Sequence, residues 1–119
     1  MIDVNAVEGV LNEMKKTSGI EDIVLVSRSG MHIAGKVPTG AHTETFSAMF
    51  AILLGAAETA TSEINQKLDH VLISLGATKM LVVNNGPKAL YVMKLSNSAR
   101  VDDILKEVER TSKKLEEHI

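Results

Sequence analysis

The residues that could carry chemistry are few and lie far apart in the chain. The four histidines are His32, His42, His70 and His118, and no two of them have the spacing of a metal-binding pair. The chain has no cysteine, which excludes disulfides, thiolate zinc sites, iron–sulfur clusters and a cysteine nucleophile. We therefore expect no metal site, and we interpret the histidines as residues of strand faces and the surface.

Common catalytic motifs are also missing from the sequence. It contains no GxxxxGK(S/T) motif for nucleotide phosphates, and the two glycines Gly76 and Gly86 are typical of hairpin turns. The acidic pair Glu116–Glu117 indicates a solvated helix end rather than a general acid and base. None of the serines Ser27, Ser29, Ser47 and Ser74 has the context of a nucleophile elbow. We predict a protein that is not an enzyme, has no catalytic residue or cofactor, and neither binds nor hydrolyses GTP.

Composition limits the class of protein further. The chain has 119 residues, 45% hydrophobic and 24% charged, which predicts one globular domain over residues 1–119. The net charge of −2 provides no basic field, so we do not expect nucleic acid as a partner. The longest apolar stretch, residues 48–57, is too short to span a bilayer, and the N-terminus lacks the pattern of a signal peptide. We expect no membrane insertion and a cytoplasmic location.

Hydrophobic spacing predicts eight elements in the order α-β-β-α-β-β-β-α. Asp3 or Asn5 is expected to cap a first helix that ends at Ser18–Gly19, and Asn97 or Ser98 to cap a last helix that extends to Leu115. The predicted central helix covers residues 43–67, and the predicted strands cover residues 22–27, 31–37, 69–75, 79–84 and 89–95. Short loops favour antiparallel hairpins, and strands that are apolar on both faces require helices on both sides. The predicted fold class is α/β (α+β), a three-layer α-β-α sandwich.

The central helix has more apolar surface than one sheet can cover. Its main stripe is expected to face the sheet and consists of Phe46, Met49, Phe50, Leu53, Ala57, Ala60 and Ile64. The segment 48–57 is nevertheless apolar on all sides, and Ala48, Ile52, Gly55 and Thr59 lie on the flank away from Leu54. Either another helix of this chain covers that flank or a partner subunit does. A twofold axis would let one patch serve both copies.

The segment from Asp69 to Leu75 predicts an apolar strand that precedes a hairpin and lies at a sheet edge. An exposed apolar edge is an aggregation hazard unless it is covered, and pairing with a symmetry mate would cover it. The strand and the helix flank therefore predict one homodimer interface. Its residues are Ala48, Ile52, Gly55, Ala56, Thr59, Val71, Leu72 and Ile73.

Several segments together resemble the Roadblock family, which includes dynein light chains and bacterial and archaeal regulators of small Ras-like GTPases. The hairpin segment 23–34 with Gly30 in its turn, the alanine-rich central helix, the runs 79–84 and 89–93 and the closing segment 98–115 carry this resemblance. The resemblance implies a profilin-like Roadblock fold, with a five-stranded antiparallel sheet between the central helix and the two terminal helices. It also implies a homodimer through the central helices and the third strand.

For function, the resemblance implies a non-enzymatic homodimeric adaptor or regulator that binds a small Ras-like GTPase and modulates its cycle or location. Two alternatives stay open: a purely structural subunit of a larger complex, like the dynein light chains, and a small-molecule sensor with a pocket at the dimer seam. A GTPase activator could offer an arginine finger, for which Arg28, Arg100 and Arg110 are the candidates. Ordinary solvation of a helix or turn explains each of these arginines more simply.

Overall fold

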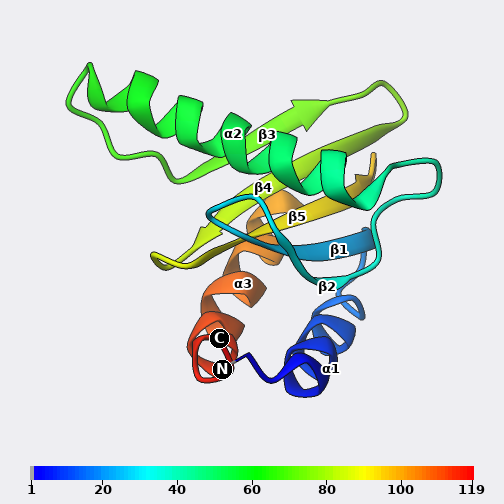
Figure 1. The fold of residues 1–119 in the computed structure, drawn as a ribbon. Helices are drawn as coiled ribbons and strands as arrows, with labels where there is room; N and C mark the ends of the chain where they lie inside the picture. The colour runs from blue at the N-terminus through cyan, green and yellow to red at the C-terminus, as the bar shows by residue number, and fades with distance from the viewer. Residues whose placement is uncertain (1) are drawn as a thin grey trace.

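The structure is a computed structural model that describes residues 2–119. Its sheet has the strand order β2-β1-β5-β4-β3, and every neighbouring pair is antiparallel (Figure 1). One of the two edge strands, residues 70–74, is the strand that the sequence predicted at a sheet edge. The elements are α1 (Val4–Met14), β1 (Ile20–Ser27), β2 (His32–Gly35), α2 (Thr43–Ser62), β3 (His70–Ser74), β4 (Thr78–Asn85), β5 (Ala89–Ser96) and α3 (Val101–Glu116).

The predicted three layers are confirmed. Figure 1 shows α2 alone on one face of the sheet, while α1 and α3 lie on the other face. Strands β1, β4 and β5 are buried along most of their length because their side chains alternate between two apolar clusters. The larger cluster lies under α1 and α3 and includes Leu25, Tyr91 and Ile104. The smaller cluster lies under α2 and includes Val24, Leu54 and Val92.

Several predicted element boundaries are wrong. The first helix ends at Met14 rather than at Ser18–Gly19, and the first strand begins at Ile20 rather than at Asp22. The central helix ends at Ser62 rather than near Lys67. Asn65, just beyond it, takes a left-handed backbone conformation (φ 57°), which a right-handed α-helix cannot include. The last helix has Arg100 as its N-cap rather than Asn97 or Ser98. The hydroxyl of Ser98 instead lies 3.3 Å from that of Ser96. The second strand covers residues 32–35 rather than 31–37. The first helix is capped as expected, because the Asp3 carboxylate accepts a hydrogen bond from the N–H of Ala6 at 3.1 Å.

The predicted sheet-facing stripe of α2 is rotated from the observed one. Ser47, Ala51 and Leu54 are buried against the sheet, whereas Met49 and Ile64 of the predicted stripe are 55% and 68% exposed. The rings of Phe46 and Phe50 pack beside the contact, with their centroids 4.7 Å apart.

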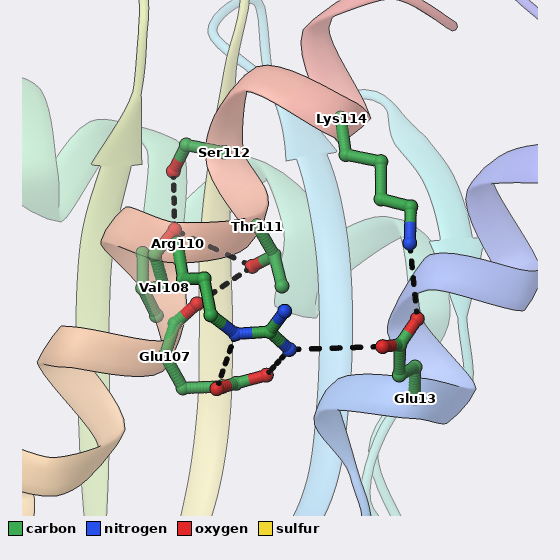
Figure 2. A network of polar contacts seen from close by, with 7 residues as sticks. All are labelled: Glu13, Glu107, Val108, Arg110, Thr111, Ser112 and Lys114. Carbon is green, nitrogen blue, oxygen red and sulfur yellow. Dashed lines mark hydrogen bonds and ion pairs between the residues drawn. The ribbon is translucent and has the colours of Figure 1, made fainter.

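An ion-pair network joins the two helices of the opposite layer (Figure 2). Glu13 of α1 lies 3.6 Å from the Arg110 guanidinium and 3.4 Å from the Lys114 ammonium, both on α3. Arg110 also makes two hydrogen bonds to Glu107, which lowers the pKa of that carboxyl group. Near the chain ends, the N–H of Asp3 donates to the carbonyl of His118 at 2.9 Å. This layer is therefore held together by its own contacts.

Candidate protein-interaction surface

The side of α2 that faces away from the sheet is an uncovered apolar surface. Met49 and Ile52 are 55% and 61% exposed there, and Ala56 lies one turn further along. With Phe50 and Leu53 they line a shallow groove of about 340 Å³ in which no charged side chain takes part. Because α1 and α3 lie on the far face of the sheet, no helix within residues 2–119 covers this groove (Figure 1).

The edge strand β3 continues this surface from the helix to the sheet. Every residue of β3 pairs with β4, and its other side has no neighbouring strand in the sheet. Val71 and Ile73 pack against the same buried cluster as Phe50 and Leu53 of α2, so the helix groove and the strand edge are continuous. Leu72 points to the other face of the sheet and is 44% exposed. We call this region the α2–β3 surface; it consists of Met49, Phe50, Ile52, Leu53, Ala56, Val71, Leu72 and Ile73.

The eight residues predicted for the interface differ in their solvent exposure. Ile52, Ala56 and Thr59 are exposed on the outer side of α2. Gly55 is half-buried, but a Cβ added there would meet nothing within 4 Å, so its surroundings are open. Ala48 is half-buried because the β1–β2 turn packs on it: a Cβ at Gly30 would lie 3.1 Å from the Ala48 Cα. Gly30 has φ +93°, so this close turn requires glycine.

Sequence reasoning missed Met49, Phe50 and Leu53 as members of this surface and placed them in the sheet-facing stripe. A usable signal was present for Met49, because it lies three positions before Ile52 and residues at that spacing share a helix face. Leu53, in particular, is half-buried rather than enclosed by the core.

The three candidate arginines are all paired with carboxylates. Arg28, in the β1–β2 turn, contacts Glu58 of α2 and donates a hydrogen bond of 2.7 Å to the Asn84 side chain on β4. Arg100 lies 3.2 Å from Asp103, and Arg110 is held by the Glu107 and Glu13 carboxylates. The Arg28 contacts tie the turn, the helix and the sheet together, which gives this arginine a structural explanation.

The remaining polar groups do not assemble into a reactive site. His70 lies 2.7 Å from the carboxylate of the adjacent Asp69, and the ring of His32 bonds to the carbonyl of Gly35. Across residues 2–119, no three side chains of the metal-binding types come together, and no helix is long and apolar enough to cross a membrane. The feature of the described chain that stands out is therefore the uncovered apolar α2–β3 surface.

Comparisons with known proteins agree with this architecture. The model of the Roadblock/LC7 domain family matches residues 6–94. Two uncharacterized proteins of Methanocaldococcus jannaschii are 33% identical over 88 residues, which cover 73% of this chain and 77% of each relative. Among solved structures, Myxococcus xanthus MglB superimposes with a TM-score of 0.84 at 14% identity, covering 97% of this chain and 88% of that one. An MglB structure described as having a tetrameric arrangement gives a TM-score of 0.81 at 20% identity, covering 97% and 90% of the two chains.

Proposed function

Because the chain belongs to the Roadblock/LC7 domain family, we propose that it is a non-enzymatic homodimeric adaptor that binds a small Ras-like GTPase and modulates its cycle or location. The observation that carries this proposal is the uncovered α2–β3 surface, which is apolar and runs from the outer side of α2 to the edge of the sheet. Water exposure of such a surface is unfavourable, and burial against a protein removes that cost. The resemblance to GTPase regulators supplies the class of partner.

A second copy of the chain fits the α2–β3 surface on symmetry grounds. About a twofold axis at Leu72, β3 pairs with itself in antiparallel fashion, which sets Val71 opposite Ile73 and extends the sheet. The same axis brings the two α2 helices together along Ile52, Ala56 and Thr59. The open backbone at Gly55 permits a close approach there.

The energy of such an interface resides mainly in a few apolar side chains. Burying one isoleucine or methionine side chain contributes roughly 1.5–3 kcal/mol, and the twofold axis repeats each contribution. Ile52 and Met49, both more than half exposed in the isolated chain, have the most surface to bury. The dimer would then present two copies of every other surface to a GTPase.

The proposal is tested by sedimentation velocity with a small Ras-like GTPase of the same organism, loaded with GDP or with a non-hydrolysable GTP analogue. We expect a complex heavier than the dimer, formed preferentially with one nucleotide state. Ile52→Glu should weaken the complex, whereas Lys106→Glu, an exposed change on α3, serves as a control for surface charge.

Two outcomes would contradict the proposal. An intact dimer that binds the GTPase in neither nucleotide state would favour the purely structural subunit. The sequence has no phosphate-binding motif, so the proposed adaptor is not expected to bind GTP itself. Direct binding of GTP by the isolated protein would therefore contradict the proposal.

A further inference from the structure

The two edges of the sheet are built differently. At one edge, β3 has an unbroken register with β4 over all five residues. At the other edge, β2 is only four residues long and its register with β1 shifts between Leu25 and Val26. Long, regular edges invite pairing with another chain, whereas short and irregular edges resist it. The open edge is the one within the α2–β3 surface.

Side chains occupy the backbone groups at the end of β2. The N–H of Gly35 donates to the Glu8 carboxylate at 3.4 Å. The carbonyl of Gly35 lies 2.7 Å from Nε2 of His32. Since a carbonyl oxygen can only accept a hydrogen bond, the His32 ring must carry a proton on Nε2. Both backbone groups of Gly35 are therefore engaged by side chains and are not free to pair with an incoming strand.

The local backbone gives these two contacts their position. Gly35 has φ +88°, and a Cβ there would collide with the Ile23 carbonyl oxygen, so glycine is required and the strand bends at this point. Helix α1 packs against β2, which places Glu8 beside Gly35. Lys36 follows Gly35 directly and Pro38 comes two residues later, and both residue types oppose pairing at an edge.

We infer that Glu8 and His32 close the β2 edge to strand pairing, so that the sheet can extend only through β3 and assembly stops at two copies. Closure of the β2 edge depends only on the contacts at Gly35. The limit of two copies also rests on the proposed dimer through β3. If both edges could pair, each dimer would offer two further edges, and contacts of this kind propagate into open chains. The side chains at Gly35 thus act against polymerisation.

The test compares two double variants that differ only in hydrogen-bonding ability. In Glu8→Ala with His32→Ala, both Gly35 groups become free. In Glu8→Gln with His32→Gln, the charge of Glu8 and the imidazole are lost as well, but the amides can still accept from the N–H and donate to the carbonyl. Sedimentation velocity and light scattering across a wide range of protein concentration follow the mass of each variant, and circular dichroism follows its fold.

We expect the double-alanine variant to form species larger than the wild type as concentration rises, with native circular dichroism, and the double-glutamine variant to keep the wild-type mass. A double-alanine variant with the wild-type mass at every concentration would overturn the inference. So would large species that have lost native circular dichroism, because the two side chains would then serve folding rather than edge closure. A monomeric wild type would overturn the proposed dimer instead, while growth of the double-alanine variant would still report on the β2 edge.

Discussion

At the scale of single residues, the Tyr91 hydroxyl has an environment that the sequence does not reveal. Tyr91 lies on β5, is completely buried, and its hydroxyl has no hydrogen-bond partner within the described chain. The nearby hydroxyls of Thr111 and Ser112 donate instead to α3 carbonyls, at 2.8 Å and 2.6 Å. No sequence pattern could have predicted this unpaired group, because it depends on how α3 settles over the sheet.

Burial raises the pKa of Tyr91 from 10.0 to about 12. A raised folded-state pKa means that this residue's contribution to stability is complete below pH 10.0 and is lost as pH rises towards about 12. We expect the free energy of unfolding to fall over that range in the wild type and to fall less in Tyr91→Phe. The phenylalanine variant should be about as stable as the wild type at neutral pH, because it removes an unpaired buried hydroxyl.

Tyr91 is the chain's only tyrosine, and the chain has no tryptophan, so phenolate absorbance reports this group alone. Titration of the folded protein near the ordinary value of 10.0 would contradict the burial argument.

At the scale of elements, α2 shows where hydrophobic periodicity fails. Because the segment 48–57 is apolar on every side, the pattern does not single out one face. The buried face proves to be the one that carries Ser47, Ala51 and Leu54. Large apolar residues such as Met49 lie outside, where the sequence alone could not distinguish a surface for a partner from a surface for the core.

Helix boundaries show the same dependence on surroundings. Asp3 caps α1 as predicted because it sits directly before an apolar stripe and is free to bond the next turn. Ser98 does not cap α3, because its hydroxyl lies beside that of Ser96 and the chain still follows a turn. When a side chain can contact either of two nearby groups, the tertiary structure, and not the residue type, determines which one it contacts.

The two faces of α2 give a direct mutational contrast. Leu54 is 1% exposed, so Leu54→Glu forces a carboxylate into the core and should reduce the free energy of unfolding by more than about 3 kcal/mol. Ile52 is 61% exposed, so Ile52→Glu should leave each chain folded but separate the dimer. Urea unfolding and gel filtration measure the two effects. Equal destabilisation of the folded chain by both changes would contradict the assignment of faces.

At the scale of the whole molecule, the order of elements and the antiparallel hairpins could be predicted from the sequence. Turn residues and short loops fix which consecutive strands pair. The pairing of β1 with β5 joins segments about 70 residues apart, and hydrophobic patterning does not specify such a partner. This pairing nevertheless creates the centre of the sheet and leaves β2 and β3 as its two edges.

Binding of a second copy of the chain at the α2–β3 surface is the step on which the proposed function depends most. In the isolated molecule, Met49, Ile52 and Leu72 keep about half of their surface in water, although the core elsewhere is well enclosed. A dimer through α2 would cover Met49 and Ile52, and pairing of β3 with its copy would place the two Leu72 side chains next to each other.

The most direct measurement is the mass of the purified, untagged protein in solution, obtained by light scattering coupled to gel filtration at micromolar concentration. We expect a single species of twice 12.8 kDa. A single species of 12.8 kDa at the same concentration would contradict the proposed homodimer and the role assigned to the α2–β3 surface.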